Sequence, residues 1–249
     1  MALADAGAAA PIVLLSVSDS SIESAAAAIG AARGTVVAHT SGSRDVSALE
    51  AARTRGALVG GFHPLAAVVK GGPDTSREAY AAVFRGGTVA LEGTDEVRAR
   101  LSPLAVSLGA HPFAIRGDQK PLYHLGASML AAFSAGLAQV AWDQMVAAGA
   151  SHAIASAGVG HLLRTVSDNV ARAPMPAAAL TGPVARGDAA GVARQRRAAA
   201  ALPEEARRLY DAHVLHNIRL ALRAGRIDER TATQLADAVR GASGENHPS

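Results

Sequence analysis

Lys120 stands out first, because the chain has only two lysines and otherwise carries its positive charge on arginine. An ammonium group can release a proton as a general acid, whereas an arginine guanidinium stays charged. The segment GDQKPLYH, at 117–124, follows a β-rich half of the sequence and precedes a half that is helical in pattern. Lys120 is therefore a candidate proton donor at a domain boundary; the alternative is an ordinary residue in the first turn of a helix.

Polar side chains also follow three of the expected strands. The carboxyl ends of parallel strands lie along one edge of a sheet, where α/β proteins bind ligands. These groups could therefore line one cleft; alternatively, the serines and the aspartate cap helices and the histidines are structural. The residues are Ser18 and Asp19 after the first strand, His39 and Ser41 after the second, and His63 after the third.

The elements that must position these groups are short apolar runs alternating with helical segments, a pattern that predicts an α/β fold with a mainly parallel sheet. From residue 121 onward the pattern predicts helices only. We therefore expect an α/β domain at 1–118 and an all-helical domain at 119–249. Strands are expected at 12–17, 35–38, 57–60, 88–93 and 112–115, and helices at 96–109, 121–149, 153–171 and 189–201, with two more opening at Pro203 and Asp228.

Composition excludes several classes of protein. A chain with 49% hydrophobic and 18% charged residues and a net charge of +3 is globular, not disordered. Its densest basic run, at 194–208, lacks interleaved aromatic residues and is interpreted as a solvated helix face, so no nucleic-acid partner is expected. The chain has no cysteine, and its histidines lack the spacing of a metal site, so we predict no metal. With no secretory signal pattern near the start, we expect a cytoplasmic location.

The helix expected at 121–149 is apolar on all sides, so its domain, a partner subunit or both must bury it. It is rich in alanine, glycine and serine and contains Gln139, which favours close packing between helices over contact with lipid. We therefore predict no membrane partner, and the helix is compatible with a homodimer through the C-terminal helices.

Four motifs occur along the chain in a fixed order. Together they resemble a Rossmann-like family whose C-terminal half is a domain of unknown function (number 2520), related to ketopantoate reductase, pyrroline-carboxylate reductase and 6-phosphogluconate dehydrogenase. The resemblance covers roughly residues 11–240. The motifs are HTSGS at 39–43, GFHPL at 61–65, KPLYH at 120–124 and LTGPVARGD at 180–188.

The resemblance implies a domain that binds NAD or NADP, a helical domain that forms a homodimer, and a site between them. In that family a lysine donates a proton or hydrogen bond to the reacting carbonyl, a role that falls on Lys120 here. The implied cofactor-binding residues are Val17, Ser18, Asp19, His39, Ser41 and Gly42, and the implied substrate-binding residues are Ser41, His63, His124, Asn169 and Arg186.

Three departures from the family pattern leave two functions open. No Gly-x-Gly-x-x-Gly turn is present to approach a pyrophosphate, so the chain is expected to lack the first βαβ unit of the domain. Ala132 and Gln195 stand where the family tends to have asparagine and histidine. The first hypothesis is an NAD(P)-dependent oxidoreductase that transfers hydride to the carbonyl or imine of a small acidic metabolite. The alternative is a non-catalytic dimeric protein that binds a ligand or partner.

Overall fold

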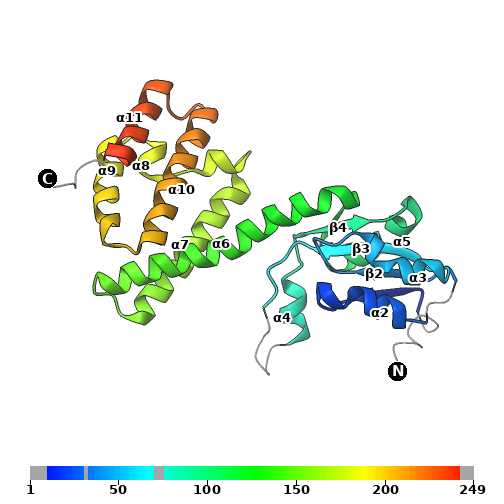
Figure 1. The fold of residues 1–249 in the computed structure, drawn as a ribbon. Coiled ribbons are helices and arrows are strands. Elements are labelled where there is room, and N and C mark those ends of the chain that lie inside the picture. Colours follow the sequence, from blue (N-terminus) through cyan, green and yellow to red (C-terminus); the bar gives the residue numbers. More distant parts are fainter. Residues whose placement is uncertain (1–9, 31–32, 70–75, 242–249) are drawn as a thin grey trace. The chain divides into compact units, whose positions relative to one another are not determined.

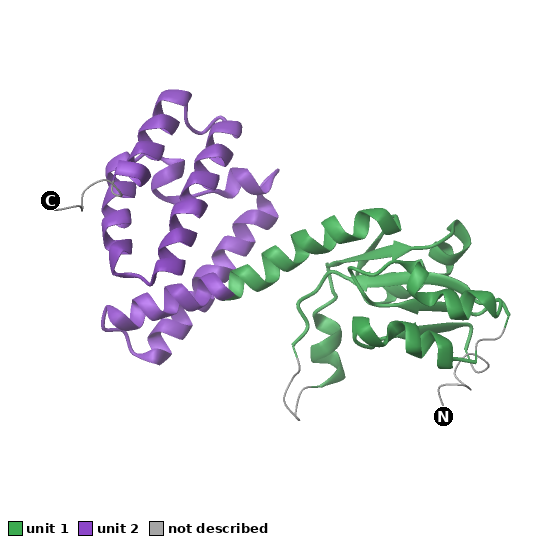
Figure 2. Cartoon of the chain, viewed as in Figure 1, with its two compact units in different colours: residues 1–135 green, residues 136–249 purple. Residues whose placement is uncertain are grey.

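The computed structural model describes residues 10–30, 33–69 and 76–241. The chain divides into two compact units, residues 1–135 and 136–249 (Figure 2). The division falls inside one continuous helix, α6 (Lys120–Ala147).

The first unit contains a five-stranded sheet (Figure 1). Three of its four strand pairings are parallel, and the pairing of the third strand with the fourth is antiparallel. The predicted α/β class with a mainly parallel sheet is therefore confirmed, and comparison with solved structures below bears out its Rossmann-like character. The strands, in spatial order, are β1 (Ile12–Leu15), β2 (Val36–His39), β3 (Leu58–Pro64), β4 (Thr88–Glu92) and β5 (His111–Ala114).

Apolar side chains cover both faces of this sheet. On one face, alternate strand residues such as Leu15 and Val37 pack with α2 (Ile22–Ala28) and α3 (Glu50–Thr54). On the other face, residues such as Phe62 and Leu91 pack with α5 (Asp95–Ser107), whose first turn is capped by the side chain of Thr94. The remaining elements of this unit are α4 (Arg77–Ala82) and the 3-10 helices η1 (Asp19–Ser21), η2 (Val46–Leu49) and η3 (Gly117–Gln119).

Two adjacent glycines in β3 allow close packing on opposite faces. A Cβ atom placed on Gly60 would lie 2.6 Å from Cγ1 of Val97 in α5, so this helix packs directly on the strand backbone. Consecutive strand residues point to opposite faces, so Gly61 leaves its free space on the other side of the sheet.

The second unit is helical, as predicted. Its core contains Val192, Ile218 and Leu235 from three different helices. Within the basic run at 194–208, Arg196 is buried and lies 2.6 Å from Asp211, so the interpretation of the whole run as a solvated face is wrong at this residue. The elements are α7 (His152–Arg172), η4 (Pro176–Ala179), α8 (Gly182–Ala185), α9 (Ala189–Ala198), η5 (Ala199–Ala201), α10 (Glu204–Arg223) and α11 (Glu229–Arg240).

The LTGPVARGD motif builds the turns around α8. Gly182 and Gly187 both have positive φ angles, of 87° and 68°, which favour glycine. The side chain of Asp188 accepts a hydrogen bond from the backbone N of Gly191 and caps α9, as the sequence predicted. This motif therefore has a clear structural role within the second unit.

The long helix α6 is largely exposed. Residues 117–147 are long and apolar enough to cross a membrane by length and composition alone, and none of their most apolar window is buried. Lys120 is the one buried residue of α6. Of the two ways of burying this helix that the sequence left open, cover by the chain's own domain is not found, and cover by a partner subunit remains a prediction. Its exposed large apolar side chains are Leu122, Leu125, Met129, Leu130, Phe133 and Leu137.

Candidate active site

Three residues paired across neighbouring strands leave space for the side chain of Lys120 on one face of the sheet. His39 pairs with Gly61 between β2 and β3, and Gly61 pairs with Glu92 between β3 and β4. Side chains at paired positions point to the same face of a sheet. Gly61 has no side chain, and the ammonium of Lys120 occupies that space: a Cβ atom on Gly61 would lie 3.1 Å from Nζ.

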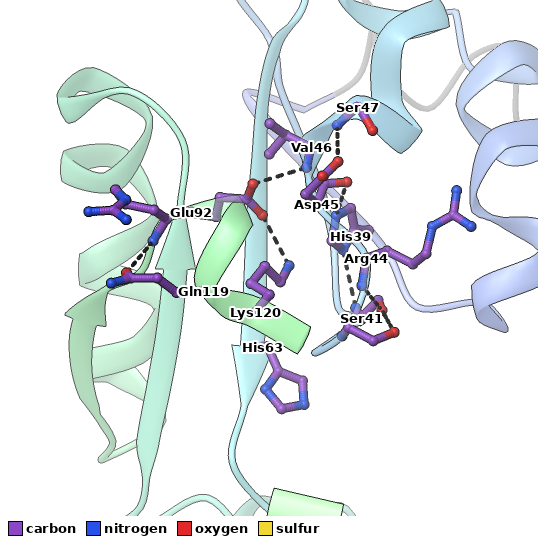
Figure 3. A network of polar contacts seen from close by, with 12 residues as sticks. His39, Ser41, Arg44, Asp45, Val46, Ser47, His63, Glu92, Gln119 and Lys120 are labelled. Carbon is purple, nitrogen blue, oxygen red and sulfur yellow. Dashed lines mark hydrogen bonds and ion pairs between the residues drawn. The ribbon is translucent and has the colours of Figure 1, made fainter. Parts of the chain in front are cut away.

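Lys120 forms a buried ion pair with Glu92 (Figure 3). Its Nζ donates a hydrogen bond of 3.0 Å to Oε2 of Glu92, and Oε1 of Glu92 accepts one of 3.1 Å from the backbone N of Val46. Lys120 is only 1% exposed and Glu92 4%. Burial lowers the pKa of Lys120, and the charge and hydrogen bond of Glu92 oppose that shift. Lys120 is thus not an ordinary first-turn residue.

Glu92 was not predicted from the sequence to belong to the candidate site. The signal that could have indicated it is an acidic residue closing an apolar strand, in a chain with a lone lysine at a domain boundary. A buried ammonium needs an acidic partner, and this glutamate ends β4.

His39 is fully buried beside this pair and is held as a neutral ring. Its Nδ1 accepts a hydrogen bond from the backbone N of Ser41, so Nε2 carries the proton and donates to the carbonyl oxygen of Asp45 (both 3.2 Å, Figure 3). Burial, followed by the charge of Lys120, lowers the pKa of His39 to about 4. The ring therefore joins the two ends of the loop that follows β2.

Hydrogen bonds connect the loops after β1 and β2, which is one of the two arrangements that the strand order left open. Ser41 and Ser43 donate hydrogen bonds of 3.0 and 2.8 Å to Oδ2 of Asp19. Burial acts to raise the pKa of Asp19, but these two hydrogen bonds together with the charges of His124 and His39 outweigh it, and the pKa is lowered. Val17 and Ser18 lie exposed in the same loop. The structure thus brings the predicted cofactor-binding residues of these two loops to one edge of the sheet.

His63 forms a second cluster with the first turn of α6. It lies inside β3, one residue before the strand ends, and not in the loop after it as predicted. Its Nδ1 lies 2.9 Å from the hydroxyl of Tyr123, and its ring meets the rings of Tyr123 and His124 edge to face. Burial, followed by the charges of His124 and Lys120, lowers the pKa of His63 to about 4. Tyr123 was given no role from the sequence, although it is three residues after Lys120.

Gly42 lies against the second cluster. A Cβ atom there would lie 2.5 Å from Nδ1 of His124 and 2.6 Å from Nε2 of His63. The backbone of the HTSGS motif therefore packs directly on both imidazole rings, and a larger residue at this position would force the rings to move.

Gly42→Ala is accordingly expected to lower the free energy of unfolding by about 1–3 kcal/mol, because the added methyl group forces both rings to move. Gly136→Ala is the matched control, since a Cβ atom there meets nothing within 4 Å beyond its own helix, and it should raise stability by about 0.5–1 kcal/mol. Urea unfolding of both variants measures the effects. Equal changes of the same sign would contradict the close contact.

Two predicted substrate-binding residues belong to the second unit. Asn169 is exposed on α7 and accepts a hydrogen bond of 3.4 Å from Arg172. Arg186 is exposed at the end of α8. Gln195, which departs from the family pattern, accepts a hydrogen bond from the hydroxyl of Tyr210. The substrate-binding roles of Asn169 and Arg186 remain predictions. Among the described residues, no group of three or more histidine, aspartate or glutamate side chains could hold a metal ion.

The sheet, its helical covering and the polar loops at its edge define a Rossmann-like domain followed by a helical one. The chain belongs to the family "Domain of unknown function (DUF2520)", which matches residues 88–216. No curated protein matches the sequence.

Solved structures share this fold. Protein TM1727 from Thermotoga maritima is 22% identical, with a TM-score of 0.67 over 87% of this chain and 79% of that one. BF3122 from Bacteroides fragilis, described as a candidate NADP oxidoreductase, is 19% identical, with a TM-score of 0.63 over 84% and 76%. A pyrroline carboxylate reductase from Plasmodium falciparum with NADP bound is 10% identical, with a TM-score of 0.56 over 94% and 81%.

Proposed function

We propose that this protein is an NAD(P)-dependent oxidoreductase that transfers hydride to the carbonyl or imine carbon of a small acidic metabolite. The observation that carries the proposal is the buried Lys120–Glu92 pair, which lies beside polar loops at the carboxyl ends of parallel strands. Support also comes from the fold shared with the Plasmodium reductase, whose structure holds NADP.

In this proposal Lys120 stabilises the negative charge that develops on the reacting oxygen or nitrogen. Its charge lowers the pKa of both His39 and His63, so it already acts on the groups around the site. Glu92 fixes the ammonium in place and favours its charged form against burial. Ser41 and Asp19 hold the two loops in the arrangement that would border the cofactor.

The residues present fit one half of a dinucleotide better than the other. Bound NAD(P)H would supply the hydride, with its nicotinamide and ribose beside Gly42, Ser41 and the loop at 17–19. The pyrophosphate half needs a glycine turn at a helix N-terminus. The sequence contains no Gly-x-Gly-x-x-Gly turn, and the loop after β1, which this proposal places at the nicotinamide and ribose, carries the carboxylates of Asp19 and Glu23, which repel phosphate.

This poor fit to the pyrophosphate favours the second candidate function. In that case the protein is a non-catalytic dimer that binds a ligand or partner through the same loops. The exposed apolar side chains of α6 support a homodimer in either case, and we propose a cytoplasmic location for both.

Cofactor binding and turnover together test the proposal. The full chain should bind NADPH or NADH in a fluorescence titration and oxidise it with one of a panel of small 2-oxo acids. Lys120→Met/Glu92→Leu, which removes both charges together, should lower turnover by about 10²-fold or more while cofactor affinity stays near that of the wild type. Failure to bind either nucleotide would refute the reductase and leave the ligand-binding protein.

A further inference from the structure

A cavity of about 500 Å³ opens beside the second cluster, entirely within the first unit. Its walls are the end of β3, the chain immediately after it, and one side of the first three turns of α6. Volumes of about 300–1,000 Å³ are typical of small-molecule sites. One end is polar and carries His63, Tyr123 and His124, whereas most of the remaining wall is apolar or small: Leu65, Ala66, Ala67, Gly126, Ala127 and Leu130.

The polar end offers hydrogen-bonding groups that are neutral or unpaired. The pKa of Tyr123 is raised by burial, so its phenol keeps its proton at neutral pH. His63, with its lowered pKa of about 4, is neutral there as well. Nδ1 of His124 is buried and has no hydrogen-bond partner among the described residues.

The surrounding charges favour an anionic head group. Glu92 is paired with Lys120, whereas Asp19, held by two serine hydroxyls, keeps its negative charge. At His63 the charge of Lys120 nevertheless has a larger effect on the pKa than that of Asp19. A cationic head group would meet two imidazoles and the ammonium behind them. When Nδ1 of the neutral His63 donates to the oxygen of Tyr123, the phenol O–H is left to donate to a carboxylate, which Lys120 would also attract.

The cavity wall along α6 determines whether the part of the ligand beyond the head group is polar or apolar. Gly126 and Ala127 leave room beside the helix, and Leu65 and Leu130 provide apolar contact. A second polar group would lose hydrogen bonds to water on entering this part of the cavity, where Ser128 is the one polar lining residue that could replace them. An aliphatic chain would instead gain by leaving water.

We propose that this cavity binds a monocarboxylate with an aliphatic body, with its carboxylate held by the phenol of Tyr123 beside His63 and His124 and its chain along the small residues of α6. The inference deepens the proposed function by giving the class of its acidic substrate. It also places Tyr123, which the sequence did not indicate, in contact with the ligand.

Binding of octanoate to the full chain, measured by isothermal titration calorimetry without nucleotide at pH 7, tests this proposal. Octanoate should bind the wild type at least tenfold more tightly than 1-octanol, which has the same chain without the charge. Tyr123→Phe should weaken octanoate binding at least fivefold, through loss of one hydroxyl. Ala127→Leu should weaken it at least tenfold, by filling the cavity.

Ala132→Leu is the matched control, because this exposed residue is on the same helix but does not line the cavity, and it should leave the affinity unchanged. Absence of octanoate binding by the wild type, equal binding of octanol, or an unchanged affinity in Ala127→Leu would each overturn the proposal. Because no nucleotide is present, a chain that binds octanoate but not NADPH retains this site and loses only the reductase function.

Discussion

Replacing Glu92 with leucine is expected to lower the free energy of unfolding by about 3–5 kcal/mol, because it leaves the ammonium of Lys120 buried without a counter-charge. The backbone N–H of Val46 also loses its acceptor. Urea unfolding at pH 7, followed by circular dichroism, measures the change. A loss below about 1 kcal/mol would mean that Lys120 reaches water in solution.

The double variant Lys120→Met/Glu92→Leu shows whether the stability lost by Glu92→Leu comes from the unpaired charge or from the changed packing. Replacing a buried ion pair with apolar residues of similar volume is often neutral or stabilising, so the double variant should recover most of the stability lost by Glu92→Leu. If single and double variants are equally unstable, the cost arises from the shape of leucine at residue 92 and not from the unpaired charge.

Acid should destabilise the protein between pH 6.5 and pH 4, partly through His39. In the unfolded chain this histidine takes up a proton near its ordinary pKa of 6.5, whereas in the folded protein it stays neutral down to about 4. The unfolded state therefore binds more protons in this range, and stability falls as the pH falls. The contribution of His39 to this loss is about 3 kcal/mol by pH 4.

His39→Gln isolates that contribution. The glutamine amide can donate to the carbonyl of Asp45 and accept from the backbone N of Ser41, as the neutral imidazole does, but it does not titrate. Urea unfolding from pH 7.5 to pH 4 should show a shallower decline in the variant. At pH 7.5 the histidine is neutral in both states, so the difference there gives the packing cost alone. Parallel curves at all pH values would show that His39 titrates normally in the folded protein.

The strands and helices could be predicted from sequence because each has a local pattern. Apolar runs give β1 to β5, and Asp188 and Gly149 mark helix ends that the structure contains. The direction of β4 could not be predicted, because an apolar strand has the same pattern in either direction. The reversal depends on how the long connection from Leu65 to Gly87 returns to the sheet, which no local signal specifies.

The candidate site was predictable only in part for a related reason. Polar residues after parallel strands must gather at one edge, so the meeting of Asp19 with Ser41 followed from topology. Glu92 reaches Lys120 only because β4 is antiparallel to β3 and pairs with Gly61. Tyr123 joins His63 only because α6 begins over that face of the sheet. Both depend on long-range placement.

Gly60 and Gly61 constrain the order in which this protein can change during evolution. A Cβ atom at residue 61 would lie 3.1 Å from the ammonium of Lys120 and 3.2 Å from Oε2 of Glu92, so alanine there requires the buried ion pair to shift by a few tenths of an ångström. A Cβ atom at residue 60 would lie 2.6 Å from Cγ1 of Val97 and 3.1 Å from the backbone O of Glu92, so alanine there requires both α5 and β4 to give way. Descendants should therefore keep glycine at 60 more strictly than at 61, and residue 61 is expected to gain a side chain first in those that lose the ion pair.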